Sequence, residues 1–286
     1  MKQILFRGIR TDTRKKVISF LLLSFLLTPL SMMAQYDLLS AKKNVIRGGY
    51  NFWVYTPEDY YFSMDTTPLI IFLHGRSLCG HDLNRVLRYG PIDAVKRGRD
   101  IPALIVAPQN PGGSWNPHKL NDILEWMKKK YPFDATRVYV LGMSLGGYGT
   151  LDFAGTYPEK IAAAIALCGG STLRDYHKLG ELPLWIVHGT ADRAVSVKES
   201  QKVVAGMQQL GITNRLRFDW MKGASHGALA RFFYTAKTYD WLFQHSLTDP
   251  GRPVCTVIDI TQTDLSGAYR DMQRRVDELE VELNGD

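Results

Sequence analysis

Short apolar runs alternate with amphipathic stretches along most of the chain. Runs such as Leu69–Leu73 (LIIFL) are continuous, which is typical of strands buried on both faces of a sheet. Strands alternating with helices indicate an α/β fold with a doubly wound, mostly parallel sheet and helices on both faces. The predicted strands are Tyr50–Tyr55, Leu69–Leu73, Ala103–Ala107, the run that starts at Val138, Ile161–Leu167, Leu184–His188 and Leu216–Trp220.

The stretches between these strands have helical spacing or turn composition. In His118–Tyr131, for example, apolar residues recur at the three- and four-residue steps of one helix face. A polar loop is expected before Pro68, and Pro108–Pro117 is predicted to be a second loop. The predicted helices are Asp82–Arg97, His118–Tyr131, Tyr148–Tyr157, Val197–Gly211 and Ala228–Phe243.

The chain after Pro250 has a different pattern. Val254–Ile260 has the composition of a short strand. Beyond it, apolar residues recur in alternating steps of four and three, the spacing of a coiled-coil seam that would allow self-association. The alternative is a lone amphipathic helix that packs on its own domain or frays in solvent. The seam positions are Leu265, Tyr269, Met272, Val276, Leu279 and Leu283.

The first 34 residues have the features of an export signal peptide. A basic stretch ends at Lys16, the apolar run Val17–Leu30 follows, and Ala34 is a small residue suited to cleavage. An uncleaved anchor is the alternative, but Val17–Ala34 contains Pro29 and is shorter than the roughly 20 residues that span a bilayer. We therefore expect a signal peptide at 1–34, a catalytic domain at 35–248 and an extension at 249–286. The mature protein would be periplasmic or secreted, without stable membrane insertion.

Charge and cysteine content remove several other classes of function. The formal net charge is +7, but the leader contains six Lys and Arg against a single Asp, which leaves about +2 elsewhere. The sequence contains no basic patch that would indicate nucleic-acid binding. The three cysteines, Cys79, Cys168 and Cys255, are an odd number without C-x-x-C spacing. They indicate no metal or redox site, and nothing in the sequence calls for a cofactor.

The strand that begins at Val138 ends in the pattern Gly-x-Ser-x-Gly, with Ser144 at its centre. A sharp turn between a strand and a helix would leave Ser144 exposed, and Gly142 and Gly146 would make room for that turn. The unpaired amides at the start of the helix favour negative charge beside the hydroxyl. This context predicts an acyl-transfer nucleophile, whereas the alternative is a glycine-rich turn around an ordinary serine.

A nucleophilic serine needs a base, and the base needs a carboxylate to orient it. Asp192 follows the strand at Leu184–Gly189 (LWIVHG), and His226 lies in the glycine-flanked loop Lys222–Gly227. Both positions are beyond the carboxyl ends of strands, where sheets of this kind bind ligands. The order Ser144, Asp192, His226 is the order of the α/β hydrolases.

Other histidines and acids compete for these roles. His188 ends a strand and is an alternative base, although strand-end packing explains it as well. Asp219 is an alternative acid, and His74 is expected to shape the loop that follows its strand. The remaining histidines have no partner pattern, and the scattered His and Asp residues lack the spacing of metal ligands.

These motifs together resemble one known superfamily. The chain contains His74-Gly75, G-M-S-L-G-G-Y-G, H-G-T-A-D and A-S-H-G in order. Across about residues 45–245 it resembles the α/β hydrolases. Within them it is similar to single-domain secreted esterases grouped with feruloyl esterases, acetyl-xylan esterases and dienelactone-hydrolase-type proteins.

The resemblance implies a role for each site residue. Ser144 attacks an ester carbonyl, His226 takes the serine proton and returns it to the leaving alcohol, and Asp192 holds the imidazole. The backbone amides of Leu145 and Arg76 form the oxyanion hole. Removal of the Arg76 side chain would leave its amide in place, so that side chain is free to contact the substrate.

The substrate class rests on weaker signals. The connection Gly169–Pro183 is too short for a cap domain, and an open cleft suits an acyl group on a polysaccharide. Trp115, in a loop after a strand, could stack on a sugar or an aromatic acyl group, or pack the loop. The resemblance implies removal of feruloyl or acetyl groups from polysaccharides or oligosaccharides. The alternatives are a peptidase, a general carboxylesterase or thioesterase, and a non-catalytic binding module. The lack of a propeller-sized domain disfavours the peptidase.

Overall fold

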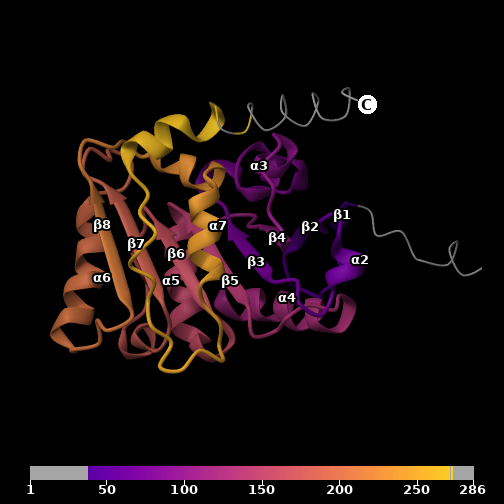
Figure 1. The fold of residues 1–286 in the computed structure, drawn as a ribbon, viewed down its shortest axis with the longest axis horizontal. Helices are drawn as coiled ribbons and strands as arrows, with labels where there is room; N and C mark the ends of the chain where they lie inside the picture. The colour runs from indigo at the N-terminus through magenta and orange to yellow at the C-terminus, as the bar shows by residue number, and fades with distance from the viewer. Residues whose placement is uncertain (1–37, 271, 273–286) are drawn as a thin grey trace, which may run out of the picture. The chain divides into compact units, whose positions relative to one another are not determined.

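The computed structural model describes residues 38–270 and 272, which fold around one mixed sheet (Figure 1). Its eight strands lie in the order β1-β2-β4-β3-β5-β6-β7-β8. β1 and β2 run antiparallel to their neighbours, and the strands from β4 to β8 are parallel. The strands are β1 (Leu39–Lys42), β2 (Asn51–Tyr55), β3 (Leu69–Leu73), β4 (Leu104–Gln109), β5 (Val138–Met143), β6 (Ala163–Leu167), β7 (Leu184–Gly189) and β8 (Leu216–Met221).

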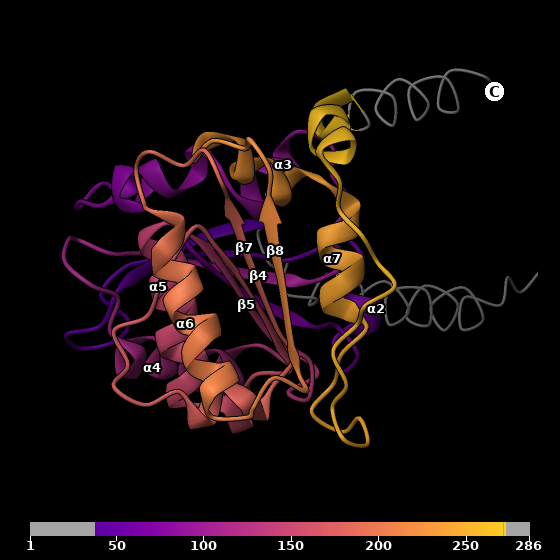
Figure 2. The same ribbon diagram turned by 90° about the vertical axis from the view of Figure 1, so that its left-hand side faces the viewer.

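Helices cover both faces of this sheet. α4, α5 and α6 pack on one face, and α7 packs on the other (Figure 2). None of the helices within the described residues is long and apolar enough to cross a bilayer. The α-helices are α2 (Tyr60–Ser63), α3 (Pro91–Lys96), α4 (Pro117–Lys130), α5 (Leu145–Thr156), α6 (Val197–Gln209) and α7 (Ala236–Phe243). The 3-10 helices are η2 (Arg76–Leu78), η3 (Leu83–Arg88), η4 (Pro158–Lys160), η5 (His177–Glu181) and η6 (Gly227–Tyr234).

The predicted doubly wound sheet is confirmed. Each strand predicted for the sheet is present, and β3 has the predicted bounds because every one of its residues is buried and apolar. The pattern missed β1 and the single turn of α2. β1 (LSAK) is a partly exposed edge strand, so no run of apolar residues marks it.

The predicted helix over Asp82–Arg97 is wrong as a single element. η3 ends at Arg88, and α3 starts only at Pro91. Gly90 has φ of 109°, and a Cβ there would lie 2.5 Å from the ring of Phe72. The chain therefore turns at Gly90 to pass the Phe72 ring, in a conformation that favours glycine.

The predicted helix over Ala228–Phe243 is also interrupted. Thr235 has an extended conformation and separates η6 from α7. The hydroxyl of Thr238 donates to the carbonyl of Phe232 at 2.7 Å, and the hydroxyl of Tyr239 donates to that of Phe233 at 2.5 Å. These side-chain donors satisfy carbonyls that backbone amides would bond in a continuous helix.

The strand suggested for Val254–Ile260 is absent, because side chains hold that segment. The amide of Cys255 donates to Nε2 of His245 at 3.0 Å. Its carbonyl accepts from Nε1 of Trp241 at 2.9 Å. Both backbone groups of Cys255 are thus bonded without a neighbouring strand.

A helix follows over 262–270 and packs on the same domain. Leu265, Ala268 and Met272 are buried in the hydrophobic core. Tyr269 is 41% exposed, with its ring 4.7 Å from that of Tyr234. The described part of the predicted seam therefore makes contacts within this chain. The leader predicted for 1–34 and the seam positions at 276, 279 and 283 lie outside the described residues.

Candidate active site

Ser144 lies in a strained turn between β5 and α5. Its φ of 60° and ψ of −122° are rare for a residue other than glycine. Its amide donates to the carbonyl of Leu167 on β6 at 2.8 Å. A Cβ on Gly146 would lie 1.8 Å from the carbonyl oxygen of Leu73, and one on Gly142 would lie 2.4 Å from that of Gly146. Both glycines are therefore required for the turn that presents Ser144.

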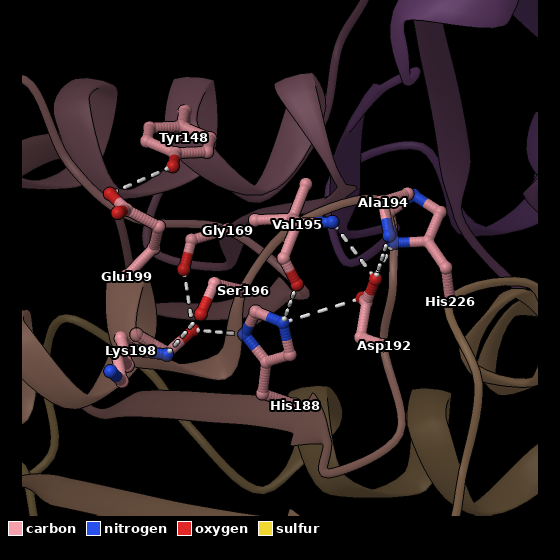
Figure 3. A network of polar contacts seen from close by, with 11 residues as sticks. Tyr148, Gly169, His188, Asp192, Ala194, Val195, Ser196, Lys198, Glu199 and His226 are labelled. Atoms are coloured by element: carbon pink, nitrogen blue, oxygen red, sulfur yellow. Dashed lines mark hydrogen bonds and ion pairs between the residues drawn. The ribbon is translucent and has the colours of Figure 1, made fainter.

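Asp192, in the loop after β7, is the fixed acid of the site. Its side chain is fully buried, and Oδ1 accepts the amides of Ala194 at 2.8 Å and Val195 at 2.9 Å. Oδ2 lies 2.6 Å from Nδ1 of His226 (Figure 3). Burial alone would raise the pKa of Asp192, but the hydrogen bonds from Val195, His226 and Ala194 lower it overall. Asp192 is therefore an ionised carboxylate at neutral pH.

His226 lies in the loop between β8 and η6, and its side chain is 25% exposed. Since the carboxylate of Asp192 accepts at Nδ1, this nitrogen carries a proton. Nε2 of the neutral ring is then free to accept a proton, as a general base requires. His226 and Ser144 line the same cavity, which has a volume of about 570 Å³.

The two amides expected to form the oxyanion hole begin separate helices at this cavity. Arg76 is the first residue of η2, Leu145 is the first of α5, and both line the cavity. Neither amide has a hydrogen-bond partner within the described residues. A Cβ on Gly75 would lie 3.4 Å from Cβ of Ser144, so the start of η2 is beside the serine. An oxyanion formed at Ser144 could accept from both amides.

Two further residues hold the loop that leads into η2. The hydroxyl of Tyr89 accepts a hydrogen bond from the amide of Gly75 at 2.6 Å, and Tyr89 also lines the cavity. His74 is fully buried, donates from Nδ1 to the carbonyl of Gly75 at 2.7 Å and accepts the amide of Asn110 at Nε2 at 3.0 Å. Burial lowers the pKa of His74 to about 4, so the ring is neutral. The expectation that His74 shapes this loop is confirmed, whereas no sequence signal indicated Tyr89.

Trp115 does not line the cavity. Its side chain is 3% exposed, and its Nε1 donates to the carbonyl of His74 at 3.3 Å. A Cβ on Gly149 of α5 would lie 2.6 Å from the indole. The suggestion that Trp115 contacts substrate is therefore corrected: it packs its loop against α5. The side chain of Arg76, in contrast, is exposed and lines the cavity.

The alternative acid lies away from His226, whereas the alternative base contacts Asp192. Asp219 accepts from Nε1 of Trp185 at 2.6 Å and from Arg217 at 3.0 Å. His188 is fully buried, and its Nε2 lies 3.3 Å from Oδ2 of Asp192. Asp192 is thus the acid bonded to His226, and His188 is a second histidine on the same carboxylate.

Cys168 completes the cluster under the site. It is fully buried with φ of 48°, and its thiol lies near the carboxylate of Asp192. One ligand atom each from Cys168, Asp192 and His226 lies within 4.8 Å of the others. Metal binding would need a thiolate, but burial raises the pKa of Cys168 and favours the thiol. The cluster fits a hydrogen-bond network better than a metal site.

Solved structures with similar folds include esterases and an acylaminoacyl peptidase from Pyrococcus horikoshii. No model of a known protein family matches the chain. A solved thermostable esterase is 25% identical with a TM-score of 0.60, over 73% of this chain and 64% of that one. A feruloyl esterase module from Clostridium thermocellum, solved with sinapinate, is 15% identical with a TM-score of 0.55, over 70% of this chain and 87% of that one. The fold is that of an α/β hydrolase.

One curated relative extends the likeness to sequence. Acetylxylan esterase A from Emericella nidulans is 25% identical over 154 residues, which are 53% of this chain and 50% of that protein. The chain thus spans about half the length of this relative. The predicted resemblance is confirmed, in sequence at low identity to acetylxylan esterase A and in fold to a feruloyl esterase module.

Proposed function

We propose that this chain is a serine esterase that uses Ser144, His226 and Asp192 as a catalytic triad. The observation that carries the proposal is the 2.6 Å hydrogen bond between His226 and Asp192, beside a cavity that His226 shares with Ser144. Asp192 holds the Nδ1–H tautomer, so Nε2 of His226 takes the hydroxyl proton as Oγ of Ser144 attacks the ester carbonyl. The amides of Arg76 and Leu145 stabilise the tetrahedral oxyanion.

The second half of the reaction uses the same groups in reverse. His226 returns its proton to the leaving alcohol, which departs and leaves an acyl group on Ser144. Water then attacks this acyl-enzyme, with His226 as its base. The resulting acid is released and Ser144 recovers its proton. Asp192 stabilises the imidazolium that forms in each half-reaction.

We propose acyl groups on polysaccharides or oligosaccharides as the substrate class. Only a short connection that contains η5 separates β6 from β7, and the cavity at Ser144 is open. Relatives named as acetylxylan esterase and feruloyl esterase point to acetyl or feruloyl groups. These names support the class of ester, whereas the acyl group itself has to be measured.

The first experiment compares turnover of three esters by protein that starts at Gln35. The substrates are methyl ferulate, p-nitrophenyl acetate and acetylated xylan, with the Ser144→Ala variant as control. We expect wild-type turnover of at least one ester, no turnover by the variant, and a fluorophosphonate label on Ser144. Full activity in Ser144→Ala would overturn the triad. Labelling without ester turnover, or faster cleavage of a p-nitroanilide peptide, would retain the triad and refute the substrate class.

Export is a separate proposal. The composition of 1–34 supports a signal peptide that is cleaved after Ala34, which would deliver the enzyme to the periplasm or the outside of the cell. N-terminal sequencing of protein recovered outside the cytoplasm should begin at Gln35. Recovery of the intact leader in a membrane fraction would instead support the anchor.

Self-association through 265–283 also remains a proposal. The described part of this segment already buries Leu265 and Met272 in its own domain, so a second copy would contact the positions beyond them. Light scattering on chains that end at residue 272 or 286 tests this. A monomer in both cases would refute self-association.

A further inference from the structure

The carboxylate of Asp192 has a second histidine partner, which the catalytic steps above do not use. Nε2 of His188 lies 3.3 Å from Oδ2 of Asp192, the same oxygen that accepts from Nδ1 of His226. Nε2 of His188 also lies 3.0 Å from the carbonyl oxygen of Val195. Figure 3 shows Asp192 between the two rings, with the amides of Ala194 and Val195 on its other oxygen.

The partners of His188 fix which of its nitrogens carries a proton. Nε2 faces a carboxylate and a carbonyl, and since neither can donate, this nitrogen must be the N–H. Nδ1 lies 2.7 Å from the hydroxyl of Ser200 on α6, which can donate to it. The hydroxyl of Ser200 has one proton and is also hydrogen bonded to the carbonyl oxygen of Gly169, so it donates either to that oxygen or to Nδ1. The two acceptors at Nε2 therefore require a proton on that nitrogen, whichever of its two partners Ser200 donates to.

We propose that His188 is a positioning residue, which donates from Nε2 to Asp192 and Val195 and thereby holds the carboxylate that orients His226. This inference rests on the proposed triad. Val195 is bonded to both partners, since its amide donates to Asp192 and its carbonyl accepts from His188. His188 is in turn anchored to α6 through Ser200. The orientation of His226 thus depends on contacts from β7 and α6 as well as on its own loop.

The surroundings of His188 predict the direction of its effect on pH dependence. The titratable groups that act on the ring are Asp192 and His226. Cys168 lies near the same carboxylate, and Lys198 and Glu199, whose carboxylate accepts from Tyr148, directly precede Ser200 on α6. A hydrogen-bond donor to Oδ2 of Asp192 weakens the electrostatic interaction of this carboxylate with His226. Loss of that donor strengthens the interaction of the Asp192 carboxylate with protonated His226. The acidic limb of the pH profile of kcat/KM should therefore move to higher pH.

Two substitutions of His188 separate positioning from packing. In His188→Gln the side-chain amide can place a donor near the former Nε2, whereas in His188→Asn it reaches only the former Nδ1. We expect His188→Asn to lower kcat by about 10- to 100-fold, as loss of a hydrogen bond to a charged group implies. KM should change little, and the acidic limb should move upward. His188→Gln should recover most of kcat and the wild-type limb. A wild-type limb with equal kcat in both folded variants would show a packing role and overturn the proposal.

A measurement on the wild-type protein covers the case in which a variant does not fold. The ¹⁵N chemical shifts of the His188 ring report directly which nitrogen is protonated. We expect a proton on Nε2, and a neutral ring protonated only on Nδ1 would overturn the proposal. Neither result depends on activity. Loss of turnover in Ser144→Ala together with wild-type behaviour of His188→Asn would retain the proposed function and refute only the role of His188.

Discussion

Gly146 lies so close to Leu73 that a Cβ on the glycine would fall 1.8 Å from the leucine carbonyl oxygen. Leu73 ends β3, and Gly146 lies in the first turn of α5, so this contact sets how near the helix comes to the sheet. The approach also places Ser144 beside the loop that follows β3, which carries Arg76. The contact that shapes the turn therefore also brings the nucleophile and the oxyanion loop together.

We predict that Gly146→Ala severely destabilises the protein. Backbone atoms surround the added methyl group, so it cannot be accommodated by a rotamer change, and a loss above about 4 kcal/mol is expected. Gly227→Ala is the matched control, because no atom lies within 4 Å of its Cβ position. Urea unfolding measures both. Equal stability of the two variants would contradict the packing described for the turn.

The oxyanion role of the Arg76 amide can be tested with proline. Arg76 is the first residue of η2, and Gly75 before it is extended, so the backbone accepts proline there. Arg76→Pro removes the N–H and should lower kcat by about 10²- to 10³-fold. Arg76→Ala keeps the amide, and its kcat on p-nitrophenyl acetate should stay close to wild type. If both variants lost kcat equally, the side chain rather than the amide would be responsible.

Trp115 should affect stability rather than substrate preference. Trp115→Phe loses the hydrogen bond to His74 and part of a buried ring, so we expect a loss of about 1–3 kcal/mol. The ratio of ferulate to acetate turnover should be unchanged. Ala230→Phe is the comparison, since Ala230 lines the cavity and a larger side chain there should change that ratio. A changed ratio in Trp115→Phe would restore Trp115 as a substrate contact.

Stability should fall as the pH is lowered from about 6.5 towards 5. Burial lowers the pKa of His74 to about 4, and burial also lowers the pKa values of His188 and His245. In this range the unfolded chain binds protons that the folded chain does not, so acid favours unfolding. His74 alone, whose folded pKa lies below this range, contributes a slope approaching about 1.4 kcal/mol per pH unit, and the lowered pKa values of His188 and His245 add in the same direction.

Urea unfolding at several pH values measures this slope. The lowered pKa of Asp192 acts in the same direction but only at lower pH, because its stabilisation is lost as the pH falls below about 4. Constant or increasing stability between pH 6.5 and 5 would contradict the buried, neutral histidines.

The sequence by itself determined every strand of the sheet except β1, their order of connection to helices, and the positions of Ser144, Asp192 and His226 after strands. These features are local, since apolar runs, glycine spacing and chain order are readable without knowing which segments meet. The helix interruptions at Gly90 and Thr235 were not readable. The first depends on a distant contact with the Phe72 ring. The second depends on side-chain donors of α7 that bond carbonyls six residues earlier, and the hydrophobic pattern does not show such bonds.

Only the tertiary structure decided which side chains surround the triad. Trp115 has the composition of a substrate contact, but its loop folds inward so that the indole meets Gly149 and His74. Tyr89 is brought to the oxyanion loop by η3 and the turn at Gly90, although nothing in its sequence context suggests a site. His188 becomes a partner of Asp192 because the loop after β7 folds back over the end of its own strand. Such contacts join residues through loop geometry, which hydrophobic pattern and motif spacing do not specify.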